Sequence, residues 1–354
     1  MGDIQDYIKG WEQGIIGKFR DTMSQEMRLE RLIKRLHPRR FYVSVPISPW
    51  KMAYAKYTGT TPDGTRTHQW LDQRLVMTDE ATRSYRTCAK PQWFDLHLND
   101  TWGNWDVTAF ARASFTVPRE FHGKPMYLQL FIGGDGLLKI NGAIRQGCDC
   151  FHTEIMLSDL AVAGKRLDFE IETYQKHQVD ADAVHQLMLS QMSLLDTAVE
   201  EFYWDVAAAF SAANEEFADP EVRAWLLRHL DEAFKIVDVF ESDHETFRAG
   251  AIKARQYLRR TVYAGNRYPI PARIAGIGHS HLDYVYAWEY AEFLRKIGRT
   301  HSTQLRLMDE FPEFRFSQSQ AITYMELKAR YPDIYREIKQ RVRQKRWEIP
   351  GAFY

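Results

Sequence analysis

Residues 273–293 read RIAGIGHSHLDYVYAWEYAEF, an apolar run that leads through two histidines and an aspartate into a ring-rich stretch. Residues two apart in a strand share a face. In a strand that continues through this stretch, His279, His281 and Asp283 would therefore point the same way. Imidazole nitrogen and carboxylate oxygen are ligands that zinc accepts, although catalytic zinc sites take three or more protein ligands. The spacing fits part of a metal site and equally a hydrogen-bonded structural cluster.

The sequence beyond this stretch alternates helical and strand patterns. Helical periodicity covers 287–311 and 321–346, and strand-like runs cover 314–320 and 347–354. Strand–helix alternation of this kind predicts parallel pairing with right-handed crossovers. Ligands gather at the carboxyl ends of such strands, where the second strand ends in Ser317-Gln318-Ser319-Gln320. Three strands are too few for a closed barrel, so we expect an incomplete parallel (β/α) barrel in residues 269–354.

Residues 41–178 show a different texture of short alternating runs, among them 109–117, 126–132 and 167–173. Asn141-Gly142 stands between two short apolar runs, and this dipeptide favours a tight hairpin because both central residues of a type I′ turn need positive φ. Several short strands at this spacing predict an antiparallel β-sandwich.

Segments with helical periodicity precede and follow residues 41–178 in the sequence. This periodicity covers 4–36, with Ser24 as a candidate N-cap of its second half, and returns in 180–210, 219–240 and 243–265. We therefore expect an N-terminal helical segment over 1–40 and a helical connector over 179–268. The histidines of the connector, at positions 185, 229 and 244, have no partner at i+4, so we interpret them as surface or hydrogen-bonded residues.

The charge composition bears on which binding partners this protein could have. Forty-seven basic residues balance 47 acidic ones, which gives a net charge of +0. This balance provides no electrostatic reason to expect nucleic acid or an anionic membrane as a partner. No run approaches the ~18 apolar residues of a membrane span, and residues 1–20 lack the apolar core of a signal peptide. We therefore expect a cytoplasmic protein, in which Cys88, Cys148 and Cys150 form no disulfide framework.

Residues 271–354 resemble the start of the catalytic domain of glycoside hydrolase family 38, the retaining α-mannosidases. Four features carry the resemblance in order and spacing: His281-x-Asp283, the run Arg-Thr-x-Ser-Thr-x-Leu-Arg-Leu-Met at 299–308, the strand Phe-Ser-Gln-Ser-Gln at 316–320, and Arg-Trp-Glu at 346–348. The segments WGNWDVTAFARASFTVP (102–118) and GGDGLLKINGAIRQG (133–147) resemble the galactose-binding-like sandwich of the cytosolic branch of this family.

The resemblance implies a catalytic mechanism and assigns roles in it to particular residues of this chain. His281 and Asp283 would hold zinc, which grips two adjacent hydroxyls of mannose. A further Asp, which also acts as the nucleophile, and a further His belong to later parts of the family's domain. The family usually has Trp three residues after the metal-binding Asp, where this chain has Tyr286. We expect Tyr286 to form an altered part of the floor of the sugar site.

The resemblance therefore implies the amino-terminal part of a zinc-dependent α-mannosidase that acts on mannose-containing oligosaccharides. Its fold class would be multidomain α+β, with N-terminal helices, a sandwich, a helical connector and an incomplete barrel. Because the nucleophile is expected beyond Tyr354, no residue present takes that role, and this chain alone should be inactive. Its oligomeric state stays open, with a homo-oligomer compatible with the sequence.

Two alternatives remain. One is a non-catalytic carbohydrate-binding or assembly module that uses the sandwich and the helices. The other is a metal-dependent amidohydrolase, a class in which His-x-His supplies two joint ligands, here His279 and His281.

Overall fold

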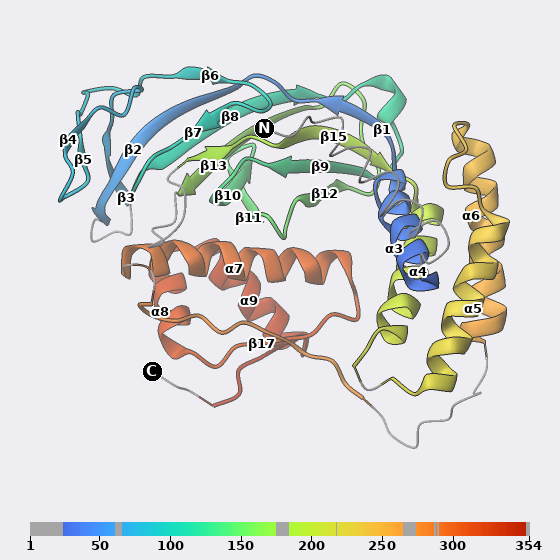
Figure 1. Cartoon of the computed structure of the whole chain (residues 1–354). Coiled ribbons are helices and arrows are strands. Elements are labelled where there is room, and N and C mark those ends of the chain that lie inside the picture. The colour runs from blue at the N-terminus through green and yellow to red at the C-terminus, as the bar shows by residue number, and fades with distance from the viewer. Residues whose placement is uncertain are drawn as a thin grey trace, which may run out of the picture. The chain divides into compact units, whose positions relative to one another are not determined.

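The computed structural model describes residues 24–60, 66–174, 184–216, 218–264, 274–286, 288 and 290–351 (Figure 1). The chain forms two compact units: Met1–Val43 with Leu195–Pro271, and Ser44–Leu194 with Ala272–Tyr354. Each unit thus combines two stretches that are distant in sequence. The first half of the predicted N-terminal helix, residues 4–23, lies outside the described residues.

The first unit is helical in the part of the chain that the structure describes. Its helices are α3 (Gln25–Leu36), α4 (Thr197–Ala213), α5 (Pro220–Ile236) and α6 (His244–Leu258). The predicted N-cap is confirmed, because the Ser24 side chain accepts a hydrogen bond from the backbone N–H of Met27 at 3.2 Å. Aspartates cap the other three helices: Asp196, Asp219 and Asp243. Leu29, Phe202, Leu230 and Phe247 are among the residues that meet in one buried core.

The second unit contains two antiparallel sheets in its described residues. The larger runs in the order β11-β10-β13-β8-β2-β3, with β6 also paired to β2. Its strands are β2 (Trp50–Thr60), β3 (Arg66–Trp70), β6 (Phe94–Leu96), β8 (Thr108–Thr116), β10 (Asp135–Ile140), β11 (Ala143–Cys148) and β13 (Arg166–Tyr174). The smaller runs β1-β15-β9-β12 and consists of β1 (Phe41–Pro46), β9 (Met126–Phe131), β12 (Glu154–Ser158) and β15 (Leu189–Leu195). Two short pairs accompany them: β4 (Met77–Asp79) with β5 (Ser84–Tyr85), and β7 (Thr101–Trp102) with β14 (His185–Gln186).

The two large sheets contact each other through their side chains. Trp50 on β2 donates its indole N–H to the Ser190 hydroxyl on β15 at 2.8 Å, and both residues are buried. Along β13, buried and less buried residues alternate with the period of two that one covered face requires. The antiparallel sheets predicted for 41–178 are therefore present, and their galactose-binding-like character stays a prediction.

The Asn141-Gly142 hairpin is confirmed. Strands β10 and β11 pair antiparallel, with Ile140 opposite Ala143, and both turn residues have positive φ, 51° and 80°.

The helical prediction for the first part of 180–210 was wrong. Residues 189–195 form β15, a central strand of the smaller sheet, and His185 lies in β14; the helix α4 begins only at Thr197. A short apolar run such as LMLSQMSLL fits either period, and the register with β9 decides in favour of a strand.

Residues 274–351 form the strand–helix part of the second unit. Three short strands, β16 (Gly278–His279), β17 (Phe316–Ser317) and β18 (Trp347–Glu348), pair in parallel in the order β16-β17-β18. The helices α7 (Tyr290–Glu310), α8 (Ala321–Arg330) and α9 (Pro332–Arg343) connect them. Parallel pairing with helical crossovers is confirmed. The predicted strands are much shorter than expected, and whether they start a barrel stays a prediction.

Helix α7 packs on the larger sheet through buried charges. Glu292 pairs with Arg295 (2.9 Å) and with Arg299, and Arg295 donates to the Thr108 hydroxyl at 3.0 Å. Lys296 reaches Asp135 at 3.1 Å. Buried ions need partners, so this network fixes α7 against β8 and β10 of the sheet. None of the helices among the described residues is both long and apolar enough to cross a membrane.

Candidate functional site

His281 and Asp283 lie side by side on the loop that follows β16. The Nε2 atom of His281 is 3.1 Å from Oδ1 of Asp283, and the two side chains are 77% and 42% exposed. Because a carboxylate only accepts, Nε2 carries the proton that it donates. The structure therefore brings these two predicted residues together and leaves them open to solvent.

Two glutamines hold this loop in place. Gln318, which is fully buried, donates its side-chain N–H to the backbone carbonyl of Ser280 at 2.8 Å. Gln320 makes a two-way contact with Leu282, donating to its carbonyl at 2.6 Å and accepting from its N–H at 3.3 Å. The loop has no helix or sheet ladder of its own to satisfy these groups. The polar end of the second strand, noted in the sequence, thus acts by fixing the backbone that carries His281 and Asp283.

A second layer of side chains supports the glutamines, and the sequence patterns did not assign this role to its residues. Tyr324 on α8 donates its hydroxyl to the Gln318 carbonyl at 2.7 Å and accepts from the Trp347 indole N–H at 2.9 Å. His301 is completely buried and stacks on Trp347, with ring centroids 5.7 Å apart. Burial lowers the pKa of His301 to about 4, so this ring is neutral at pH 7.

His279 does not join His281 and Asp283 as expected. The strand ends at His279 itself, so the alternation of a strand does not extend to 281–283. The Nδ1 atom of His279 donates to the Ser317 carbonyl at 2.9 Å instead, and the imidazole links β16 to β17.

The separation of His281 and Asp283 suits a shared zinc ion. Two ligands at 2.0–2.1 Å from a tetrahedral ion stand roughly 3.3 Å apart, close to the 3.1 Å between Nε2 and Oδ1. The ion would replace the proton between the two atoms, as metal binding to imidazole requires. Across the described ranges, no three His, Cys, Asp or Glu side chains gather in a way that could hold a metal. If this pair binds a metal, it can provide only two of the three or more protein ligands that a catalytic zinc site takes.

Tyr286 lies three residues beyond Asp283 and is 76% exposed. Its ring contacts the edge of Trp288, with centroids 5.9 Å apart and an interplanar angle of 73°. A ring this exposed has a face free for a flat ligand, so its position is compatible with the expected stacking role.

A cavity of about 220 Å³ adjoins the loop and contains residues that the sequence did not single out. Ser280 and Leu282 line it together with Asp135 and Asp149 from the sandwich side and Arg299 from α7. Burial raises the pKa of the Asp135 carboxyl, but Arg299 and Lys296 outweigh this effect and leave the pKa below its usual value. Asp135 is therefore ionised at neutral pH and pairs with Lys296 and Arg299 of α7.

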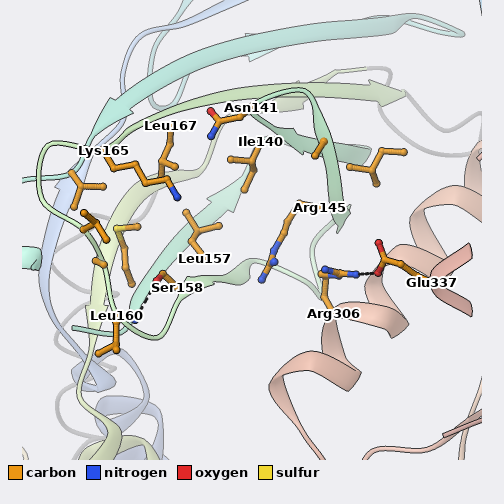
Figure 2. A pocket seen from close by; sticks show the side chains of 16 residues that line it. Ile140, Asn141, Arg145, Leu157, Ser158, Leu160, Lys165, Leu167, Arg306 and Glu337 are labelled. Atoms are coloured by element: carbon orange, nitrogen blue, oxygen red, sulfur yellow. Dashed lines mark hydrogen bonds and ion pairs between the residues drawn. The ribbon is translucent and has the colours of Figure 1, made fainter. Parts of the chain in front are cut away.

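A larger cavity of about 350 Å³ lies apart from this loop, between β11, β12 and the helices α7 and α9 (Figure 2). Its wall is apolar at Leu157, Leu160 and Leu167 and cationic at Arg145 and Arg306, and Arg306 pairs with Glu337. None of the predicted site residues lines it.

The chain is similar to a glycoside hydrolase family and to several alpha-mannosidases. Residues 271–354 match the glycosyl hydrolases family 38 N-terminal domain. The chain is 22% identical to alpha-mannosidase G of Dictyostelium discoideum over 278 residues, which cover 73% of this chain and 25% of that protein. It is 23% identical to alpha-mannosidase 2C1 of Homo sapiens over 273 residues, covering 72% and 25% respectively. The chain thus spans about a quarter of the length of these relatives.

Among solved structures, a β-glucuronidase from Ruminococcus gnavus in complex with D-glucaro-d-lactam aligns with 44% of this chain and 29% of its own, at 10% identity and a TM-score of 0.27. This structural similarity is too low to support a conclusion about the fold or the function of the chain. The resemblance that the sequence motifs indicated is nevertheless confirmed: residues 271–354 match the amino-terminal domain of family 38, and most of the chain is similar to alpha-mannosidases.

Proposed function

We propose that this chain is the amino-terminal part of a zinc-dependent, retaining α-mannosidase that removes terminal α-mannose from oligosaccharides in the cytoplasm. The observation that carries the proposal is the exposed pair His281 and Asp283, within the segment that matches family 38. Its two ligand atoms have the separation that one zinc ion needs.

The residues of this chain would bind and position the sugar. His281 and Asp283 would hold the zinc, which when bound supplies a Lewis acid for two adjacent hydroxyls of mannose. Tyr286 would offer its exposed ring to the apolar face of the pyranose. Gln318 and Gln320 would keep the metal-binding loop in one conformation, so that little ordering remains when the substrate arrives.

A retaining glycosidase needs two carboxyl groups ~5–5.5 Å apart, and this chain spans about a quarter of the length of its α-mannosidase relatives. We therefore propose that the nucleophile and the acid/base residue come from a segment other than residues 1–354. On this proposal, residues 1–354 alone neither retain zinc tightly nor hydrolyse mannosides.

An activity assay on an aryl α-mannoside tests both the proposed α-mannosidase activity and the proposed inactivity of residues 1–354 alone. Residues 1–354 should show no turnover above background. The reading frame beyond codon 354 should continue into an Asp-bearing strand end, and its product should hydrolyse the substrate. In that longer protein, His281→Ala should abolish turnover, whereas Tyr286→Trp should leave kcat similar and lower KM, because the larger ring offers more stacking surface.

Robust turnover by residues 1–354, or full activity of the longer protein carrying His281→Ala, contradicts the proposal.

A further inference from the structure

The larger sheet of the second unit carries a groove of about 240 Å³, and none of its lining residues belongs to the His281 loop. Strands β3, β8, β10 and β13 contribute to it, together with the segment just before β6. Its principal side chains are Trp70, Trp93, Phe110, Arg112, Lys139 and Glu170.

The lining residues of the groove are distributed across several strands. Trp70 lies on β3 and Lys139 on β10, and the sheet order places β2, β8 and β13 between these strands. Four interstrand spacings of ~4.8 Å give a span of about 19 Å. The lining residues are therefore spread over more than the width of one sugar ring.

Three aromatic side chains form one part of the lining. The rings of Trp70 and Phe110 meet edge to face, with centroids 5.4 Å apart. The guanidinium of Arg112 lies 4.0 Å from the centroid of Trp93. Trp70, Trp93 and Phe110 are all half-buried, so each ring is fixed by packing and still reaches solvent. Fixed, partly exposed rings are suited to stacking on the apolar faces of pyranoses.

Charged side chains of alternating sign form the other part. Arg112 stands opposite Glu170 in the β8–β13 register, and Glu170 stands opposite Lys139 in the β13–β10 register. Directly opposite residues of neighbouring strands share a face of the sheet. Within the part of the chain that the structure describes, Lys139 and Glu170 make no hydrogen bond or ion pair of 4.0 Å or less. Their hydrogen-bonding capacity is therefore available to a ligand.

This mixture of groups selects the chemistry of the ligand. The groove is lined by two cationic side chains, Arg112 and Lys139, and by two anionic ones, Glu170 and Glu172. Because these charges balance, the groove does not favour a ligand of either charge. A purely apolar ligand would cover Lys139 and Glu170 without giving them partners, which costs free energy. A neutral polyol with ring faces satisfies both halves of the lining, because its hydroxyls accept from the ammonium and donate to the carboxylate.

We propose that this groove binds a neutral oligosaccharide, at a site distinct from the His281 loop. That the oligosaccharide contains mannose rests on the proposed function. The groove would then hold part of the substrate remote from the bond that is cleaved, and its binding would need no metal.

Titration of residues 1–354 with α-mannotriose, followed by tryptophan fluorescence and calorimetry, tests the proposal. Glu170→Gln and Trp70→Ala should each weaken binding by about tenfold, the loss expected for one charged hydrogen bond or one stacked ring. Glu170 is exposed, so its variant should fold normally even where removal of the Trp70 ring disturbs the sheet. Lys165→Met is the control for Lys139→Met, because Lys165 is exposed and lies outside the groove.

The proposal predicts that His281→Ala and a chelator leave α-mannotriose binding unchanged, which separates the groove from the metal site. If the longer protein lacks mannosidase activity and the groove still binds α-mannotriose, the proposed function fails and the groove stands. Binding of maltotriose in place of α-mannotriose, with the same response to Glu170→Gln, keeps the groove as a saccharide site and overturns its assignment to mannose. Absence of binding to both sugars, or binding that Glu170→Gln and Lys139→Met leave unchanged, overturns the proposal.

Discussion

His281 and Asp283 face each other across 3.1 Å on an exposed loop, whereas His279, two residues earlier, donates to the Ser317 carbonyl at 2.9 Å. The three residues share the spacing of a strand, and only two of them can meet at one ion. The difference arises because the strand ends at His279, and it separates the mannosidase interpretation from the amidohydrolase one.

Zinc binding should therefore depend on His281 and Asp283 and not on His279. We expect residues 1–354 to bind zinc weakly, and His281→Ala or Asp283→Ala to lower that affinity by at least about tenfold, since each removes one of two ligands. His279→Ala should change it by less than about threefold, because among the described residues His279 does not gather with His281 and Asp283 into a group that could hold a metal. Calorimetric titration with zinc measures all three variants. Equal losses in His279→Ala and His281→Ala would favour the amidohydrolase alternative.

Gln318 should be a positioning residue of the loop. Gln318→Ala removes the partner of the Ser280 carbonyl in a buried place, so we expect a loss of about 1–3 kcal/mol in the free energy of unfolding. Zinc affinity should also fall at a temperature where the variant is folded. Ser319→Ala, one residue further on, is the control and should cost less than ~0.5 kcal/mol. Urea unfolding and zinc titration provide the two measurements. An unchanged zinc affinity in folded Gln318→Ala would refute the positioning role.

Gly298 should be required where α7 passes Tyr331. A Cβ atom at this position would stand 2.6 Å from Cζ of Tyr331, a buried ring. Gly298→Ala should therefore destabilise the second unit by about 1–3 kcal/mol, more than the gain in helix propensity of up to ~1 kcal/mol. Gly250→Ala on α6 is the comparison, because its Cβ would approach no atom closer than 3.3 Å. Thermal unfolding measures both. Stabilisation by Gly298→Ala would show that Tyr331 can move aside at little cost.

His301 should make the second unit sensitive to acid. Its pKa is about 4 in the folded chain, below the usual 6.5, because burial disfavours the charged ring. The unfolded state thus binds more protons between these values, so the contribution of His301 is complete above pH 6.5 and is lost as the pH falls towards 4. The loss should reach ~3 kcal/mol. His301→Phe keeps a ring against Trp347 and cannot titrate. Urea unfolding at pH 7.0, 5.5 and 4.5 should show a steeper decline for the natural chain than for His301→Phe, and parallel declines would contradict the assignment.

Local patterns predicted those parts of the fold that short-range chemistry decides. The Ser24 cap, the Asn141-Gly142 hairpin and the parallel order of the strands near His281, Phe316 and Trp347 follow from turn preferences, capping and strand–helix alternation. The segment 189–195 was predicted wrongly because its apolar residues fit both periods. Only the pairing of β15 with β9 makes it a strand.

The same distinction between local pattern and tertiary contact applies to the candidate site. The sequence by itself determined which residue types stand at the end of the first parallel strand, and the family motifs there led to the prediction that His281 and Asp283 bind zinc. The tertiary structure alone decided that these two meet, that His279 turns to Ser317, and that Gln318, 38 residues beyond Ser280 and directly after β17, holds the loop. The physical reason is that a loop without its own ladder takes its conformation from whichever distant groups satisfy its backbone. Sequence spacing does not contain that information.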